Sequence, residues 1–244
     1  MSSYIEYKLF KNIHVITSTR NDGYSKEPYN SLNMAYTIGD NPDSVLLNRN
    51  KFFTELNIEQ YKVIIPKLLE TDKVINVKSA ISERDGDSFY SYNDFILSIL
   101  HNDDSPLFYY CEDKDIIGAI NITLKSLTLG VIDKTFKKLI KDEKINPSFI
   151  HVFFAPGLKV KKLINESDLK RIRNSIFLNF YDEKNNVFNI GLAAADRLEY
   201  FGVSKENISF SSHDTYVEKE MFFSSSRDGQ TGQMISLIYR KIKD

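Results

Sequence analysis

The chain has 244 residues, of which 42% are hydrophobic and 13% aromatic, and this length is sufficient to bury a large core. Its 32 Lys and Arg residues nearly balance its 33 Asp and Glu residues, which leaves a formal charge of -1. This balance provides no strong field for phosphate backbones or anionic lipids, so nucleic acid and membrane partners are disfavoured.

The single cysteine, Cys111, excludes an internal disulfide. Residues 1–6 lack a basic segment followed by an apolar one, and no apolar run approaches the roughly 20 residues that cross a bilayer. We therefore expect a cytoplasmic protein. Because no repeat, low-complexity tract or Gly/Ser/Pro-rich linker interrupts the chain, residues 1–244 are expected to form one domain.

The first half of the chain is predicted to be mainly strands. Short segments rich in Val, Ile, Phe and Tyr predict strands at 12–19, 61–65, 73–77, 94–100, 107–111 and 115–122. A helix is predicted between the first two, with Asn41 as N-cap and Pro42 at the first helical position. Its apolar stripe contains Val45, Leu46, Phe52, Phe53 and Leu56, and a second helix is marked by Ile132, Phe136, Leu139 and Ile140.

The second half mixes the two types of element. A strand at 149–154 should stop at the Ala155-Pro156-Gly157 turn. Helices are predicted at 167–180, with Ser167 as cap, and at 189–201, with Gly202 as a left-handed C-terminal residue. A closing strand is predicted at 234–239. Because strands and helices do not alternate steadily, the pattern favours an α+β fold of mixed sheets over a doubly wound fold.

Three polar segments are candidate site segments. Arg20 follows a predicted strand and precedes the turn former Asn21-Asp22-Gly23, so it either projects a guanidinium into a site or is a surface arginine before a turn. Asn33 lies in a segment with little periodicity, where it could equally stabilise a turn. Arg227, in the glycine-punctuated loop 222–232, could hold a phosphate or pair with Asp228.

These motifs resemble, in order and spacing, those of the laccase-domain family. The resemblance rests on Ser18-Thr19-Arg20, Tyr29-Asn30-Ser31-Leu32-Asn33, Gly39-Asp40, Asn48-Arg49, Leu192-Ala193-Ala194-Ala195-Asp196-Arg197 and the loop 222–232. This is the YfiH-like group, once called multicopper polyphenol oxidoreductases and now better described as zinc-dependent purine nucleoside phosphorylases. It implies one α+β domain of packed mixed sheets with flanking helices. It also implies phosphorolysis of adenosine, inosine and methylthioadenosine, some adenosine deamination and, in some members, editing of cell-wall precursors.

The resemblance further implies a zinc ion held by a His in a Gln-x-His-Gly element, a Cys in a Thr-Ala-Asp-Cys-x-Pro element and a His in a His-Ala-Gly-Trp-Arg-Gly element. The corresponding positions here are Asp72, Asp104 and Asn121, whereas Asp103 and Pro106 match the family. Thiolate and imidazole suit zinc, but two carboxylates and an amide oxygen form a harder and weaker ligand set. We therefore expect no tightly bound zinc and no resident cofactor, with Mg²⁺ or Ca²⁺ as the alternative.

The histidines do not replace the missing ligands in the sequence. His14, His151 and His213 are isolated, and a lone histidine is more often a packed or surface residue than a ligand. His213 lies beside Asp214, which aligns with a cysteine in the family's Cys-Thr-Tyr element, so it is the histidine whose surroundings need inspection.

Three functional interpretations remain open. In the first, the protein is a purine nucleoside phosphorylase without the usual metal, with Asp103 and Lys125 as catalytic candidates and Arg20, Asn33 and Arg227 as substrate or phosphate ligands. In the second, the three metal-aligned positions hold Mg²⁺ or Ca²⁺ in a nucleoside hydrolase. In the third, the fold persists as a non-catalytic protein that binds a nucleoside or a partner. The partners implied are a purine nucleoside and phosphate, and the oligomeric state is not indicated.

Overall fold

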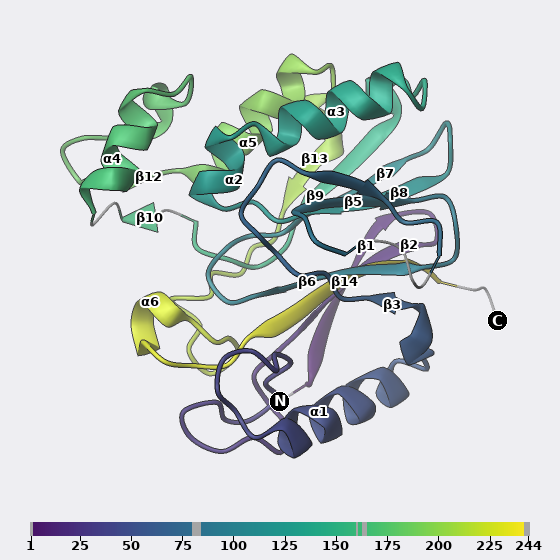
Figure 1. The fold of residues 1–244 in the computed structure, drawn as a ribbon, viewed down its shortest axis with the longest axis vertical. Coiled ribbons are helices and arrows are strands. Elements are labelled where there is room, and N and C mark those ends of the chain that lie inside the picture. Colours follow the sequence, from purple (N-terminus) through teal and green to yellow (C-terminus); the bar gives the residue numbers. More distant parts are fainter. Residues whose placement is uncertain (1, 80–83, 160, 163–164, 242–244) are drawn as a thin grey trace.

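Two β-sheets lie face to face, and helices cover the outer face of each (Figure 1). The computed structural model describes residues 2–79, 84–159, 161–162 and 165–241. One apolar cluster fills the space between the sheets, and one further cluster lies between each sheet and its helices. The predicted α+β fold of mixed sheets with flanking helices is therefore confirmed, whereas the domain range 1–244 stays a prediction.

The first sheet has five strands. In spatial order they are β1 (Tyr4–Phe10), β2 (Ile13–Ser18), β14 (Met234–Arg240), β6 (Ile96–His101) and β3 (Val63–Ile64). Its outer face is covered by α1 (Pro42–Glu55), which begins as predicted, because the Asn41 side chain accepts hydrogen bonds from the backbone N–H groups of Asp43 and Ser44. Phe52 and Phe53 of this helix are buried, but Leu46 is 48% exposed, so its place in the predicted apolar stripe was wrong.

The second sheet has six strands and is buried on both faces. In spatial order they are β13 (Ile208–Phe210), β9 (Ile150–Phe154), β7 (Leu107–Cys111), β8 (Ile116–Ile120), β5 (Ser88–Ser91) and β4 (Val74–Asn76). Successive side chains of a strand point to opposite faces. Phe108 and Tyr110 accordingly pack between the sheets, while Tyr109 and Cys111 pack beneath the helices α2 (Leu124–Thr128), α3 (Val131–Lys141) and α5 (Ile190–Tyr200). Cys111 is fully buried, and this burial raises the pKa of its thiol well above the usual value.

Smaller elements complete the chain. A three-stranded sheet is formed by β10 (Lys161–Lys162), β12 (Val187–Phe188) and β11 (Tyr181–Asp182). The remaining helices are α4 (Glu166–Arg173) and α6 (Ser225–Asp228), with the 3-10 turns η1 (Gln60–Lys62), η2 (Pro147–Phe149), η3 (Leu178–Phe180) and η4 (Lys205–Asn207).

The third predicted helix differs most from its observed counterpart. It ends at Arg173 and not at residue 180, because Ser175 turns back to bond the carbonyl of Ile172 and the chain continues as a turn. Its N-cap is Asn165, whose side chain accepts the Asp168 N–H at 2.7 Å, and not Ser167. The left-handed residue predicted at Gly202 is confirmed by its φ of 92°.

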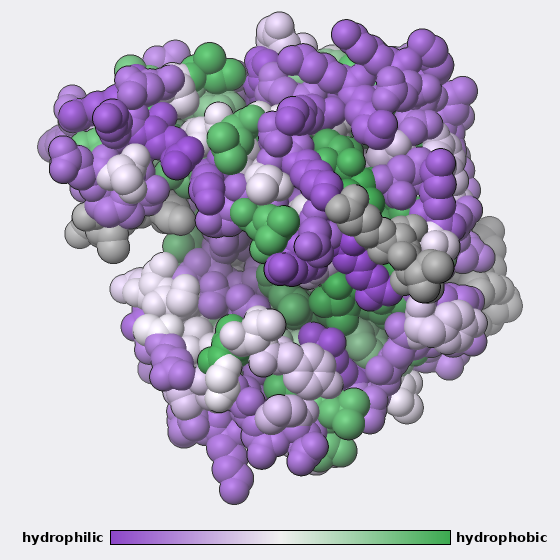
Figure 2. Space-filling view, in the orientation of Figure 1, coloured by the Kyte–Doolittle hydropathy of each residue, from purple (hydrophilic) through white to green (hydrophobic). Residues whose placement is uncertain are grey.

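The face in Figure 2 is mostly hydrophilic and carries only small hydrophobic groups, the largest of them in the hollow near the centre of the view. Among the described residues, no helix combines the length and apolar character needed to span a membrane.

Candidate functional site

The three positions aligned with metal ligands approach one edge of the six-stranded sheet. Asn121 follows the end of β8, Asp104 precedes β7, and Asp72 precedes β4. The strand ends are in register through the pairs Leu107–Ile120, Ser88–Ile120 and Val74–Ser88. A fourth polar residue, Asp87, precedes β5 at the same edge. The fold thus gathers polar residues that are separated by up to about 50 positions in the sequence.

Asp87 is fully buried, and its carboxylate ties this edge together. One oxygen accepts hydrogen bonds from the backbone N–H groups of Leu69 (3.2 Å) and Thr71 (2.7 Å) and from the Thr71 hydroxyl (3.1 Å). The other oxygen accepts the side-chain N–H of Asn121 at 2.9 Å. A buried carboxylate needs such donors, because burial without them is costly. The sequence analysis missed Asp87, since Gly86-Asp87 reads locally as part of a turn.

The residues at the aligned positions do not fit the zinc ion that the family resemblance implies. Asp72 pairs with Lys134 at 2.5 Å, and the Asn121 amide is held by Asp87. Asp104 is half-buried and, like Asp72, presents carboxylate oxygen where zinc favours sulfur or nitrogen. Within the part of the chain that the structure describes, no group of three or more His, Cys, Asp or Glu side chains is placed to hold a metal ion.

Asp103, one of the two catalytic candidates, holds two segments that are distant in the sequence. One of its oxygens accepts the Ser225 hydroxyl at 2.8 Å and the Ser226 backbone N–H at 2.7 Å, and the other is 3.4 Å from the Thr215 hydroxyl. Asp103 is only 8% exposed. These contacts attach the α6 turn to the end of the five-stranded sheet, so the carboxylate positions this turn.

His101, the histidine closest in sequence to the aligned positions, is also part of the core. Its Nε2 lies 2.7 Å from the Ser236 hydroxyl. Burial lowers the pKa of His101 to about 3, although the backbone of Asp104 and the charge of Asp103 act in the opposite direction. The ring is therefore neutral at physiological pH, and its contact with Ser236 joins β6 to β14.

All five guanidinium N–H groups of Arg227 donate hydrogen bonds within the protein. Two of them bond the Asp228 carboxylate at 2.7 and 2.6 Å. The others reach the carbonyls of Thr215 (2.7 Å), Tyr216 (2.9 Å) and Phe222 (2.9 Å). An arginine with this set of partners anchors the preceding loop, and a phosphate would have to displace them.

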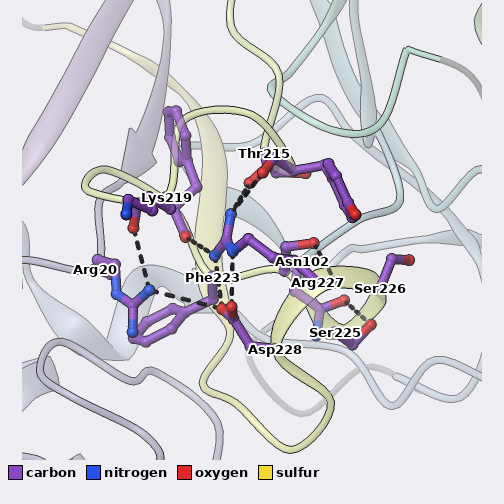
Figure 3. Close-up of polar contacts among 12 residues, drawn as sticks. Arg20, Asn102, Thr215, Lys219, Phe223, Ser225, Ser226, Arg227 and Asp228 are labelled. Atoms are coloured by element: carbon purple, nitrogen blue, oxygen red, sulfur yellow. Dashed lines mark hydrogen bonds and ion pairs between the residues drawn. The ribbon is translucent and has the colours of Figure 1, made fainter.

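Arg20 lies on the opposite side of Asp228, and Figure 3 shows this carboxylate between the two guanidinium groups. Arg20 donates to the carbonyls of Asn30 (3.2 and 3.1 Å) and Lys219 (3.1 Å), lies 3.7 Å from Asp228, and stacks over the Phe223 ring at 4.8 Å. Burial lowers the pKa of Arg20, an effect that Asp228 opposes. A polar cavity of about 340 Å³ opens beside the two arginines.

Asn33 is fully buried, and both polar atoms of its side chain are hydrogen-bonded. Its amide N–H groups bond Asp40 (2.8 Å) and the Ala35 carbonyl (3.0 Å), while its oxygen accepts from the backbone of Ala35 and Gln233, each at 3.0 Å. These bonds join the loop after β2 to the start of β14, which is a turn-stabilising role.

Lys125, in contrast, keeps its ammonium accessible. It lies in the first turn of α2, whose N-terminus is closed by a capping box between Thr123 and Ser126. The Lys125 side chain is 46% exposed and its ion pair with Glu70 is long, at 3.8 Å. Such an exposed pair holds the side chain only weakly.

A cavity of about 300 Å³ opens beside Ser105, the neighbour of Asp104. Gly157 brings the loop after β9 against this segment, since a Cβ at Gly157 would lie 2.1 Å from the Ser105 hydroxyl oxygen. His213 lines the same cavity and its Nδ1 lies 2.7 Å from the Glu218 carboxylate. The cavity is at the lower end of the range of small-molecule sites, roughly 300–1,000 Å³. The His213–Glu218 contact was not predicted, because both residues lie in an aperiodic loop.

Comparison with known proteins covers nearly the whole chain. A purine nucleoside phosphorylase of Haemophilus influenzae is 26% identical over 238 residues, which are 94% of this chain and 95% of that protein. The purine nucleoside phosphorylase YfiH of Escherichia coli is 27% identical over 235 residues, 94% of each chain.

Solved structures share the fold. YlmD from Geobacillus stearothermophilus has a TM-score of 0.88 at 20% identity, with 99% of this chain and 97% of that chain covered. The hypothetical protein YfiH of Bacillus licheniformis has a TM-score of 0.84 at 22% identity, with 94% and 93% covered. Residues 14–241 match the family model described as multi-copper polyphenol oxidoreductase laccase. The chain therefore belongs to the multi-copper polyphenol oxidoreductase laccase family, the laccase-like YfiH proteins.

Proposed function

We propose that the protein binds purine nucleosides beside Ser105 and cleaves them slowly with inorganic phosphate, without zinc, to give the base and ribose 1-phosphate. The observation that carries the proposal is the cavity of about 300 Å³ beside Ser105, the neighbour of the family-aligned Asp104. The names of the relatives, purine nucleoside phosphorylases, support this class of substrate.

Adenosine, inosine and methylthioadenosine are the proposed substrates, and hydrolytic deamination of adenosine to inosine is the proposed side reaction. A bound metal ion can lower a transition state by several kcal/mol. The aligned positions offer no thiolate or imidazole for zinc. Turnover is therefore expected to be slow compared with that of a metal-dependent relative.

The contacts described above divide the candidate residues into two groups. Lys125 is proposed to contact phosphate, because its ammonium is exposed and weakly paired. Arg20 is a second cation beside an open polar cavity. Asp103, Asn33 and Arg227 are proposed as positioning residues, since their polar atoms are already bonded to the protein.

A non-catalytic nucleoside-binding protein is the second candidate. The side chains of Arg227 and Asp103 are hydrogen-bonded within the protein, and this favours the binding function. Phosphorolysis requires groups that change partners during the reaction. The third interpretation, a hydrolase assisted by Mg²⁺ or Ca²⁺, requires Asp72 to leave Lys134 and Asn121 to present its amide oxygen while bonded to Asp87.

The three functions are separated by product analysis with inosine and adenosine, with and without phosphate, in the presence of a chelator. Ribose 1-phosphate that forms only with phosphate and persists with the chelator is the expected result. Free ribose would identify a hydrolase. No product together with a nucleoside-dependent rise in Tm would identify a binding protein, since ligands of the native state stabilise it. If no product forms and no nucleoside raises Tm, the proposal is refuted.

The proposed phosphate contact has its own variant. Lys125→Met should raise the KM for phosphate severalfold while the affinity for inosine is unchanged. Lys137→Met is the matched control, because Lys137 is also exposed on a neighbouring helix and its ion pair with Asp133 is 3.9 Å long. Equal effects of the two substitutions would remove Lys125 from the site.

A further inference from the structure

A histidine and a glutamate form a pre-oriented pair at the cavity beside Ser105. His213 Nδ1 and Glu218 Oε2 are 2.7 Å apart, and the other Glu218 oxygen accepts the Asp214 backbone N–H at 2.9 Å. Burial acts to raise the pKa of Glu218, but the bonds from His213 and Asp214 lower it overall, so the carboxylate is ionised at neutral pH. An ionised carboxylate that accepts from Nδ1 orients the ring and leaves Nε2 for chemistry.

The orientation of the ring is also set by packing. The His213 ring meets the buried Phe222 ring edge to face, with centroids 5.6 Å apart and an angle of 61°. The His213 side chain remains 26% exposed, and the residue lines the cavity. Within the described ranges, Nε2 has no hydrogen-bond partner. The geometry therefore combines a held ring with a nitrogen that makes no hydrogen bond within the described part of the protein.

Part of the cavity lining is aromatic. Phe210 stacks on Phe154 with centroids 4.5 Å apart and ring planes 6° from parallel, and Phe210 is 46% exposed. Gly191 at the start of α5 allows the Phe210 ring to lie close, because a Cβ there would be 3.2 Å from it. A flat apolar surface of this kind suits a planar heterocycle such as a purine.

We propose that His213, oriented by Glu218, is the proton-transfer residue for a purine base bound in this cavity. This inference rests on the proposed function. In the reaction, a phosphate oxygen forms a bond to the ribose C1′ while the C1′–N9 bond breaks. The proton on His213 Nε2 passes to the purine N7, so the base leaves as a neutral molecule, and hydrogen phosphate returns a proton to Nε2. No oxidant or further reactant is needed.

Other titratable groups surround the pair. Asp214 lies on the same turn, where its carboxylate accepts from the Tyr216 N–H at 2.9 Å. Lys159, from the loop after β9, lines the cavity, and its positive charge acts to lower the pKa of Glu218. Tyr7 of β1 bonds the neighbouring Ser211 hydroxyl at 3.2 Å, and its pKa is raised by burial.

The test compares His213→Gln with His151→Gln in the full-length protein. His151 is a suitable control because it stacks on Phe10 at 4.0 Å, away from the cavity. With inosine and phosphate, His213→Gln should lower kcat by about 100-fold, the scale of acid–base catalysis, and change KM less than threefold.

A binding measurement separates this inference from the proposed function. In protein with ¹³C-labelled histidine, the four ring signals are few enough to assign with the two variants, and inosine should shift the His213 signal and leave that of His151 unchanged. If inosine binds or reacts but His213→Gln keeps its rate and the His213 signal does not move, the role of His213 is overturned. If inosine neither binds nor reacts, the proposed function fails and this inference fails with it.

Discussion

Replacement of Asp87 by Ala should strongly destabilise the protein. The carboxylate is fully buried and receives four hydrogen bonds from Leu69, Thr71 and Asn121. Removal of one partner of a buried charged network typically costs 3–5 kcal/mol, because the remaining donors stay buried without acceptors. We therefore expect a loss of ~4 kcal/mol, which for a chain of this length corresponds to a fall in Tm of about 8–16 °C.

Asp87→Asn should lie between Ala and the wild type. The Asn121 amide can turn and present its oxygen to the new amide N–H, so the hydrogen bonds can be retained while the charge is lost; we expect ~2 kcal/mol. Asp85→Asn is the control, because Asp85 is 49% exposed and 3.8 Å from Lys67, and such pairs contribute at most about 1 kcal/mol. Calorimetry of the three variants and the wild type measures the changes in Tm and tests this order. A fall for Asp87→Ala no larger than that for Asp85→Asn would refute the reasoning.

The remaining predictions concern the metal-aligned positions and one acidic residue. One variant combines Asp72→His, Asp104→Cys and Asn121→His. It should bind about one zinc per chain by elemental analysis, because Asp87 already lies 2.9 Å from the side chain at 121, where a carboxylate orients a ligating imidazole; a folded variant without zinc would contradict the alignment. The hydrogen bonds from Arg227 hold the pKa of Asp228 below its ordinary 3.8, so its stabilising contribution is complete above that value and is lost as the pH falls through the lowered pKa. Asp228→Asn should therefore make Tm less dependent on pH below about 4, and superimposable acid profiles would exclude this contribution.

The central strands could be predicted from the sequence because their composition decides them locally. The segment 107–111 contains five apolar or aromatic residues, and the structure buries all of them in β7. The N-cap at Asn41 was equally readable, since the cap and the proline after it act within one turn. β5 was missed because it has four residues, two of them serine, and depends on its neighbours β4 and β8 for its hydrogen bonds.

The hydrogen-bond partners of the site residues could not be predicted from the sequence. The Ser226 N–H that Asp103 accepts is 123 positions away, and Asn121 lies 34 positions from Asp87. Local spacing carries no information on such partners, because loops bring them together only after the sheets have formed. Family resemblance led to Arg227 and Asn33, but it did not indicate that their polar atoms are bonded within the protein.

Binding and catalysis can therefore depend on different residues in this chain. Asp87 holds the loop before β4, Asp103 holds α6, and Arg227 holds the loop that leads into it. These internal bonds order the segments around the sheet edge before any ligand arrives, and a site that is already ordered loses less entropy when it binds. His213 is the exception among these polar groups, because it lines the cavity and its Nε2 has no protein partner in the described part of the chain. Substitution of the three holding residues should change Tm and affinity together, whereas substitution of His213 should change kcat alone.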